Sequence, residues 1–526
     1  MKRRDFLKYS LPATAIAHTA INGIPVRTMG MESPLIQALM GMASETDHVL
    51  VLVQMNGGND GLNMVIPIDS YSYYQAARSN VAIPQNKILS LTGTAKTGLH
   101  PFMTGIQSLY NEGKAAIIQS VGYPQPNFSH FRATDIWMSA SESNQYVNSG
   151  WVGRYLDGEF PGFPNGYPNN DMPDPLGIQI GSVTSFTFQG PQVSMGMSIS
   201  DPVNFYNLIN GVQDPAPGTP AGFELSYIRT VARQTQQYSD IIKTAALRVS
   251  QQSTYPGNNP LADQLKIVAR LVKGGLKTRI YMVNIGGFDT HSVQVNQSDT
   301  TIGAHANLLK QVSDAIKAFM DDLKFLGVQR RVLGMTFSEF GRRIKSNSSL
   351  GTDHGAAAPL ILFGEYADTK VLGDNPVIPA NATVNDNVPF QYDFRSVYAS
   401  VLEKWFCVDN TTLQTVMLKN FQSLPVVKTN ACNSSIPDLS ENLVIKNYPN
   451  PFVGSTTITF KTDGGHTSIM IIDTLGRVIR TLIDQEYSAA GQYSVTFNSE
   501  ALQAGVYYAR LQNGAFQQVR AMLKAK

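Results

Sequence analysis

The chain has 526 residues, of which 43% are hydrophobic and 15% are charged, and its formal net charge is +2. A chain of this length buries a large core and is expected to form two or three domains. The balanced charge, with no run of lysine and arginine, argues against nucleic acid or another polyanion as a partner. Cys407 and Cys432 are the only cysteines, too few for a disulfide scaffold or a thiolate metal site. They either form one bridge in an oxidising compartment or remain two free thiols.

The N-terminus is predicted to be an export signal. A basic head, Met1–Lys8, precedes a short and weakly apolar segment that ends near Ile21, whereas a membrane-spanning helix needs roughly 18 apolar residues. Residues 3–8, RRDFLK, resemble the twin-arginine signal, whose pathway carries folded proteins, often with a metal already loaded. An ordinary secretory signal is the alternative. Residues 1–44 are therefore expected to be signal and leader, and the mature protein is expected to have no transmembrane segment.

The globular part is expected to begin with a buried strand at 49–55, VLVLVQM. The glycine-rich segment 56–63 follows it, and its glycines give the backbone the freedom to form a tight turn at the strand end. Asp60 in this turn can reach a metal or a phosphate-like ligand. In the alternative interpretation Asp60 only caps its own backbone in an Asx-type turn.

A second buried strand is predicted at 115–121, followed by a helix that begins near Ser129. Ser129 would lie at the positive end of this helix, where a metal can deprotonate its hydroxyl and free N–H groups can hold an anionic substrate. Arg132, three residues later, could clamp that anion. The alternatives are a plain N-cap serine beside a packing histidine, and a solvated helix arginine. Arg342 and Arg343 are further candidates for the clamp.

A third strand is predicted at 278–285, and it runs into GGFDTH at 286–291. Asp289 and His291 are two residues apart, so in an extended segment both side chains point the same way, a spacing that can chelate zinc or a similar ion. Helices are expected at 224–250, at 261–273 and from His305 onward. His305 could support a metal ligand or could simply be a polar residue at a helix start.

A fourth buried strand is predicted at 332–337, with Glu339 at its carboxyl end, and a fifth at 359–363 after Asp353 and His354. Open α/β sheets place their chemistry just beyond the carboxyl ends of strands. Acids, imidazoles and one hydroxyl from distant parts of the chain would therefore meet at one edge. The pattern predicts a site for a divalent metal ion.

Four motifs occur in order behind the signal: GGNDGLN at 57–63, GGFDTH at 286–291, SEFGRR at 338–343 and GTDHG at 351–355. Together they resemble the bacterial domain of unknown function 1501, and the resemblance covers roughly residues 45–425. That family is placed in the alkaline phosphatase-like superfamily, with phosphatases, sulfatases and cofactor-independent phosphoglycerate mutases. The resemblance implies an α/β domain with a central mixed sheet flanked by helices. It also implies two divalent metals with a hydroxyl or thiol nucleophile between them.

The resemblance also implies roles for individual residues by their order in the chain. Asp60 resembles the acid that binds one metal beside the nucleophile, and Ser129 sits where that nucleophile would be. Asp289 and His291 resemble ligands of the other metal.

The remaining motifs allow two alignments. In the first, Glu339 occupies the strand end where relatives have an Asp-His pair, and His354 resembles a later ligand histidine. In the second, Asp353 and His354 are themselves that pair and Glu339 only supports them. Phe340 stands where a ligand histidine would be expected in the first alignment, so we expect one or two ions, with zinc, manganese or calcium as candidates. The Cys/Ser-x-Pro-x-Arg signature of sulfatases is absent, which argues against formylglycine chemistry.

The C-terminal part changes character. A polar linker at 426–440 leads into residues 441–526, where short alternating runs separated by Gly, Asp and Asn predict an all-β, immunoglobulin-like sandwich. YPNPF at 448–452, the spaced Asp473, Gly476 and Arg477, and GVYY at 505–508 resemble the C-terminal sorting domain of type IX secretion cargo in Bacteroidota. The resemblance implies passage through the periplasm and the outer membrane, with release or surface attachment. An accessory sugar-binding sandwich is the alternative.

Two functions are compatible with these patterns. The first is an exported, metal-dependent hydrolase of phosphate or sulfate esters that acts on a small molecule or a glycan. The second is a non-catalytic surface protein of the same fold that binds a glycan or an assembly partner. A phosphotransferase is disfavoured because phosphorylated metabolites are scarce outside the cytoplasm.

Overall fold

The computed structural model describes residues 47–202, 238–428 and 445–525, apart from short gaps within the last range, and the two short strands β1 (Thr19–Ile21) and β2 (Ile24–Val26). The rest of the predicted signal and leader, the predicted helix before residue 238, and most of the predicted linker lie outside the described residues. The chain divides into two compact units, Asp47–Cys432 and a second unit of Met1–Thr46 with Asn433–Lys526. Cys407 is disulfide-bonded and so is not a free thiol, and Cys432 lies outside the described residues.

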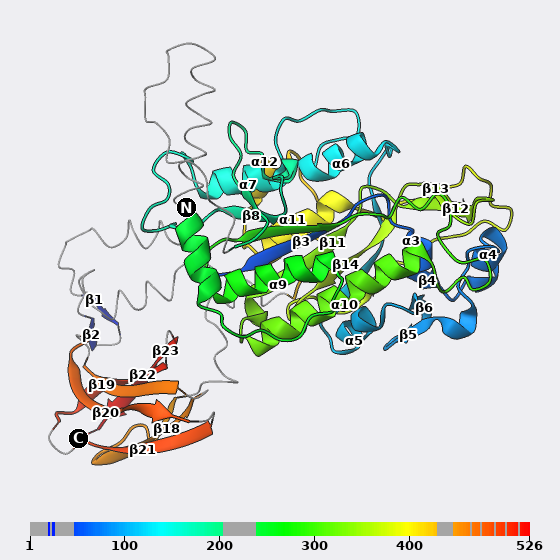
Figure 1. The fold of residues 1–526 in the computed structure, drawn as a ribbon. Coiled ribbons are helices and arrows are strands. Elements are labelled where there is room, and N and C mark those ends of the chain that lie inside the picture. The colour runs from blue at the N-terminus through cyan, green and yellow to red at the C-terminus, as the bar shows by residue number, and fades with distance from the viewer. Residues whose placement is uncertain are drawn as a thin grey trace, which may run out of the picture. The chain divides into compact units, whose positions relative to one another are not determined.

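The larger unit is built around a nine-stranded mixed sheet (Figure 1). The strand order is β15-β7-β14-β11-β3-β10-β8-β9, and β16 pairs with β7. The strands are β3 (Val49–Met55), β7 (Ala115–Gly122), β8 (Gly177–Ile180), β9 (Met197–Ile199), β10 (Ile280–Ile285), β11 (Val332–Phe337), β14 (Ala358–Phe363), β15 (Val371–Leu372) and β16 (Tyr392–Asp393). Only the pairings of β14 with β11 and β7 are antiparallel, whereas all other pairings in this sheet are parallel. The carboxyl ends of β3, β7, β10 and β11 therefore lie at one edge.

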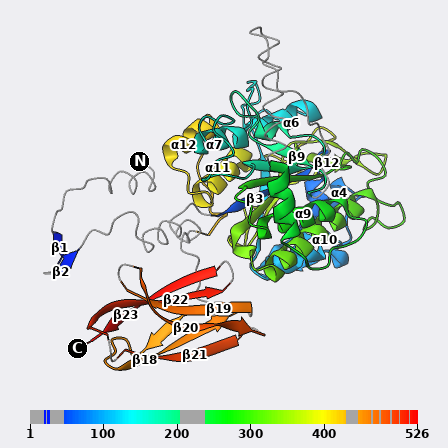
Figure 2. The ribbon, with the colours of Figure 1, turned by 60° about the vertical axis from the view of Figure 1, so that its left-hand side comes forward.

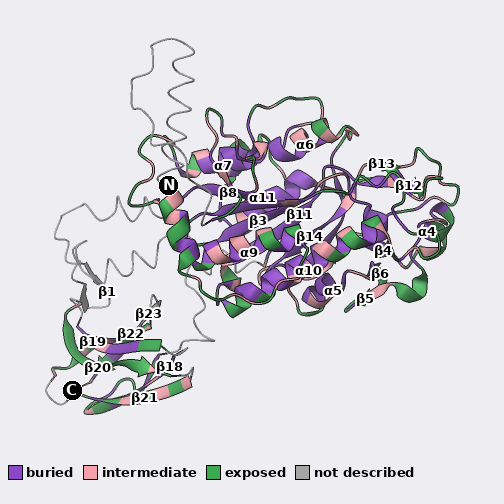
Figure 3. Ribbon diagram, viewed as in Figure 1, coloured by how far each residue is buried: buried purple, intermediate pink, exposed green. Residues whose placement is uncertain are grey.

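Helices cover both faces of this sheet (Figures 1 and 2). One apolar core lies between the sheet and α5 (Thr104–Asn111), α9 (Pro260–Lys273) and α10 (Ala304–Phe325). A second core lies between the sheet and α6 (His130–Ser139), α7 (Trp151–Glu159), α11 (Phe394–Lys404) and α12 (Asn410–Met417). Because both faces are covered, all seven residues of β3 are buried (Figure 3), which is why all of them except Gln54 are apolar.

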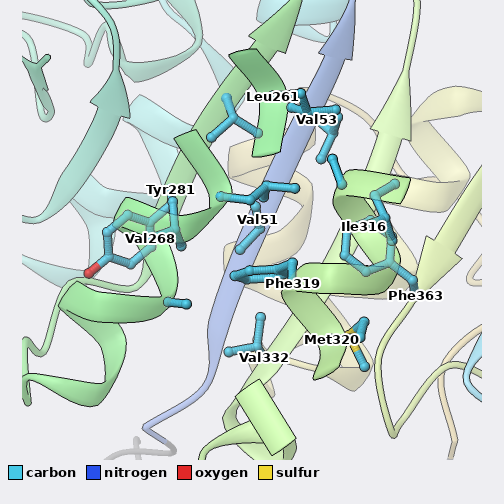
Figure 4. Close-up of a cluster of buried hydrophobic side chains, with 14 of the residues drawn as sticks. Val51, Val53, Leu261, Val268, Tyr281, Ile316, Phe319, Met320, Val332 and Phe363 are labelled. Carbon is cyan, nitrogen blue, oxygen red and sulfur yellow. The ribbon is translucent and has the colours of Figure 1, made fainter. Parts of the chain in front are cut away.

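Close packing of the first core fixes the sheet against α9 and α10. Figure 4 shows the side chains that meet there, with Val51, Val53 and Val332 from the sheet against Leu261, Val268, Ile316 and Phe319 from the helices. The remaining elements of this unit are short: α3 (Gly61–Met64), β4 (Val65–Pro67), α4 (Tyr71–Ala77), η1 (Gln85–Lys87), β5 (Leu89–Leu91), β6 (Thr94–Leu99), η2 (Phe186–Phe188), η3 (Gln329–Arg331), β12 (Arg342–Ser346) and β13 (Thr352–His354).

The C-terminal unit is all-β. One antiparallel sheet contains β17 (Lys446–Tyr448), β18 (Ser455–Thr462) and β21 (Gly491–Asn498), and the other contains β20 (Val478–Tyr487), β19 (Gly465–Ile472), β22 (Gly505–Asn513) and β23 (Phe516–Lys524). Alternate side chains of β18 are buried, and Ile458, Phe460, Ile469, Ile471 and Leu511 form the core. The predicted fold class, an α/β domain followed by a β-sandwich, is confirmed.

Candidate metal centre

Six polar side chains meet beyond the carboxyl ends of the central strands. His130 opens α6 after β7, Asp289 and His291 follow β10, Glu339 follows β11, and Asp353 and His354 end β13. We call this group the edge cluster: His130, Asp289, His291, Glu339, Asp353 and His354. Segments up to about 220 residues apart contribute to it, because parallel strands bring their following loops to the same edge.

Three imidazoles point their Nε2 atoms at one carboxylate. Nε2 of His354 lies 3.2 Å from Oδ1 of Asp289, and Nε2 of His291 lies 3.3 Å from the same oxygen. Nε2 of His130 lies 3.5 Å from Oδ2 of Asp289. Ligand atoms of His130, Asp289 and His354 all lie within 4.8 Å of one another, close enough to hold one metal ion.

The opposite nitrogen of each ring contacts an oxygen acceptor. Nδ1 lies 2.8 Å from Oε1 of Glu339 for His130, 3.0 Å from Oδ1 of Asp353 for His291, and 2.8 Å from the backbone oxygen of Phe128 for His354. A neutral imidazole that donates from Nδ1 keeps a lone pair on Nε2. The Nε2 lone pairs of the rings and the lone pairs of the Asp289 carboxylate would then face each other. Ligand atoms that share one cation are arranged in this way. Metal-binding histidines commonly donate their other N–H to such an oxygen.

Two ionisation states support this arrangement. Burial is the main cause that lowers the pKa of His354 below 6.5, so its imidazole is neutral at pH 7. Burial raises the pKa of Asp289, but the hydrogen bond from Arg342 and the contact with His354 outweigh burial and hold the pKa at about 2. The carboxylate is therefore charged and the imidazole is free to bind a cation.

Arg342 joins the loops that carry the edge cluster. Its fully buried guanidinium donates to Oδ1 of Asp289 at 2.8 Å. It also donates to the backbone oxygens of Phe288, Thr352, Gly57 and Gly58. Among the described residues, Arg342 is the one arginine that forms an ion pair with a carboxylate of the cluster, and that carboxylate is Asp289.

Glycine at position 57 lets two of these loops touch. Gly57 has φ +121°, and a Cβ there would lie 2.3 Å from the backbone nitrogen of Asp289. Its N–H donates to Oε1 of Glu339 at 2.8 Å. The GGNDGLN motif thus contributes a close backbone contact to the cluster, for which only glycine is suited.

Asp60 does not join the edge cluster. It is fully buried and forms two hydrogen bonds with Arg78, at 2.8 and 2.9 Å, while Nε2 of Gln294 donates to Oδ2 at 2.6 Å. Arg78 in turn donates to backbone oxygens of Arg343 and Ile344 in β12. Asp60 therefore stabilises the strand that begins with Arg342, and the ligand set proposed below does not include it.

Ser129 and Arg132 occupy different surroundings. Ser129 is the exposed N-cap of α6, and its side chain makes no capping hydrogen bond. Nη2 of Arg132 donates to the backbone oxygens of Glu142, Ser143 and Gln145. His305 is buried and lies 2.9 Å from Oδ1 of Asn59. It therefore does not touch the edge cluster.

Sequence reasoning missed His130 and the central position of Arg342. His130 was considered only as a packing residue beside Ser129. The available signal was its place at the start of a helix that follows a buried strand, the same position that made Ser129 a candidate. The fold and site together define an α/β domain with a histidine-rich cluster at the carboxyl edge of its sheet, where His130, Asp289 and His354 could hold a metal ion.

Two parts of the chain match the sequence models of known families. Residues 219–387 match the sequence model of the family described as protein of unknown function (DUF1501), and residues 446–525 match the secretion system C-terminal sorting domain. Both resemblances inferred from the motifs are thereby confirmed. The sorting domain implies export to the cell surface or the medium. No helix in the described ranges is long and apolar enough to cross a bilayer.

Solved structures with some likeness to the chain are distant. A protein in the alkaline phosphatase superfamily from Vibrio parahaemolyticus has 8% identity and a TM-score of 0.33, covering 91% of this chain and 82% of that one. A sulfatase from Pseudoalteromonas sp. has 9% identity and a TM-score of 0.32, covering 89% and 91%. These likenesses are too distant to bear on activity. No curated protein matches the chain.

Proposed function

We propose that the protein is an exported, metal-dependent hydrolase of phosphate or sulfate esters. The observation that carries the proposal is the convergence of three imidazole Nε2 atoms on Asp289, each ring held from behind by an oxygen acceptor. A histidine that only packs in a core needs one hydrogen-bond partner. Here three rings are instead oriented so that their Nε2 atoms converge on Asp289. We propose His130, His291, His354 and Asp289 as the ligands, with Glu339, Asp353 and the Phe128 carbonyl orienting the rings.

The ligand set favours particular ions. Three imidazoles and one carboxylate match the nitrogen-rich sites that bind zinc, with manganese second. Calcium takes six to eight oxygen ligands, so these residues fit it poorly. When bound, such an ion would supply Lewis acidity and lower the pKa of a coordinated hydroxyl or water.

The residues of the chain position the reacting groups. Ser129, which directly precedes His130, is the proposed nucleophile, because its hydroxyl is exposed and is not used to cap α6. The free N–H groups in the first turn of this helix would hold substrate oxygens beside the nucleophile. Glu339 holds the proton on Nδ1 of His130 and keeps Nε2 available.

The proposed route has two stages. The twin-arginine-like signal at 1–44 would carry the folded domain, with its metal, into the periplasm. The type IX machinery would then recognise residues 441–526 and take the protein to the surface or the medium. Substrates would accordingly be extracellular esters, either small molecules or modified glycans.

Metal analysis of the purified full-length chain tests the centre. We expect near-stoichiometric zinc or manganese in the wild type and its loss in Asp289→Ala and His354→Ala. His466→Ala is the matched control, because His466 also faces an aspartate, Asp484 at 3.3 Å, but in the C-terminal unit. A panel of phosphate and sulfate esters then tests hydrolysis. Metal-free wild-type protein without esterase activity would refute the hydrolase and favour the alternative, a non-catalytic surface protein.

A further inference from the structure

We propose that Arg343 binds the anionic oxygens of the substrate and so makes the site selective for phosphate or sulfate esters over neutral esters. The inference rests on the proposed function and names the residue that would recognise this substrate class. It is carried by the hydrogen-bonding state of the three arginines near the cluster: Arg132, Arg342 and Arg343.

Two of these arginines are engaged with other partners, Arg342 through all of its guanidinium nitrogens and Arg132 through Nη2. Arg342 is fully buried, and its Nε, Nη1 and Nη2 all donate to backbone oxygens or to Asp289. Arg132 gives its Nη2 to the 142–145 segment, and its Nη1 faces Asp135 at 3.7 Å. Its guanidinium also lies 4.1 Å from the ring centroid of Tyr146. A substrate anion would have to displace these contacts.

Arg343 is held in place but keeps part of its guanidinium unused. Its Nε donates to the backbone oxygen of His354 at 2.9 Å, and its Nη1 donates to that of Asn385. The guanidinium carbon lies 5.1 Å from the ring centroid of Phe128. Across the described part of the chain, no acceptor takes a hydrogen bond from Nη2.

These anchors place the guanidinium beside the proposed centre. The Phe128 carbonyl orients the ring of His354, and Phe128 is followed by Ser129 and His130. Arg343 therefore contacts both segments that would supply ligands and nucleophile. A guanidinium fixed at Nε and Nη1 loses little side-chain entropy when Nη2 binds an oxyanion. An arginine bound to phosphate or sulfate oxygens is a strong, charge-assisted contact.

Binding of inorganic phosphate and sulfate to the full-length protein, measured by calorimetry, tests this role without relying on turnover. Arg343→Gln should weaken both anions about 10- to 100-fold, while the bound metal stays at the wild-type level. Lys345→Gln is the matched control, because Lys345 is exposed on the same strand and its loss changes the net charge equally. Arg343→Lys, which keeps the charge but loses the fork, should fall between wild type and Arg343→Gln.

The outcomes separate this inference from the proposed function. Wild-type anion affinity in Arg343→Gln, or equal losses in Arg343→Gln and Lys345→Gln, overturns the role of Arg343 even if esters are hydrolysed. Arg343-dependent anion binding supports it even if no ester in the panel is turned over. If Arg343→Gln loses its metal, the anion affinity of Arg343→Lys is compared with that of the wild type instead. An unchanged phosphate and sulfate affinity in Arg343→Lys overturns the role of Arg343 in anion binding.

Discussion

Replacing Glu339 by glutamine should weaken metal binding while leaving the fold intact. Oε1 of Glu339 accepts from Nδ1 of His130 and from the Gly57 N–H, both at 2.8 Å. The side chain is only 4% exposed, so water screens its charge poorly. A glutamine oxygen can take both hydrogen bonds, and its NH₂ group would meet the Ser338 hydroxyl, which can accept. The substitution therefore removes the charge and keeps the shape.

The expected loss of affinity follows from that single change. A neutral partner makes Nε2 of His130 a poorer donor to the ion, and such partners are worth about 10- to 100-fold in metal affinity, or about 1.4 to 2.7 kcal/mol. Asp353→Asn is the comparison, because Asp353 holds His291 in the same way but its side chain is 52% exposed. Solvent screening should keep its effect smaller, below about 10-fold.

Zinc affinity can be measured by competition with a chromogenic chelator, with thermal unfolding of the metal-free proteins as a check on the fold. The order of affinities should be wild type, then Asp353→Asn, then Glu339→Gln. The reasoning is refuted if Glu339→Gln binds zinc as tightly as wild type, or if Asp353→Asn is the weaker binder.

Three further outcomes are expected. Asp60→Asn should cost about 3 to 5 kcal/mol of unfolding free energy at pH 7, because it leaves Arg78 buried without its counter-charge. Burial raises the pKa of Asp60, but Arg78 brings it below 3.8. The stability that the ion pair provides is therefore present above about pH 3.8 and lost as pH falls through the folded pKa. Acid denaturation curves in which the stability difference between wild type and Asp60→Asn does not shrink at low pH would contradict this. Gly57→Ala should lose bound zinc after dialysis, because its Cβ would overlap the backbone of Asp289; full retention of zinc would disprove the close contact. Ser129→Ala should lower kcat at least about 100-fold with metal content unchanged, and unaltered turnover would assign the attack to a bound water.

The strands were predictable because the sheet is buried on both faces. β3, β7, β11 and β14 are predominantly apolar, and their observed bounds differ from the predicted ones by at most one residue. The alternation of β18 likewise identified the sandwich. A helix was expected to begin near Ser129, and α6 begins at His130 with Ser129 as its N-cap. These features depend on local periodicity, which the sequence displays directly.

Partners of individual charged groups were not predictable in this way. Asp60 follows a strand end just as Asp289 does, yet Asp60 pairs with Arg78 inside the domain and Asp289 faces three histidines. Arg132 and Arg343 look alike as candidate anion clamps, but their hydrogen bonds differ. Such choices depend on which loops pack together, and loop packing has no period in the sequence.

The sequence alone predicted the two-part architecture, five of the nine strands of the central sheet and the gathering of polar loops at one edge, because hydrophobic patterning identifies buried strands and places the polar motifs at their ends. Only the tertiary structure decided that His130 belongs to the cluster, that Asp60 does not, and which nitrogen of each imidazole faces Asp289. The physical reason is that ring orientation is set by acceptors such as Glu339 and the Phe128 carbonyl, which come from other loops and reach the rings only after the sheet has formed.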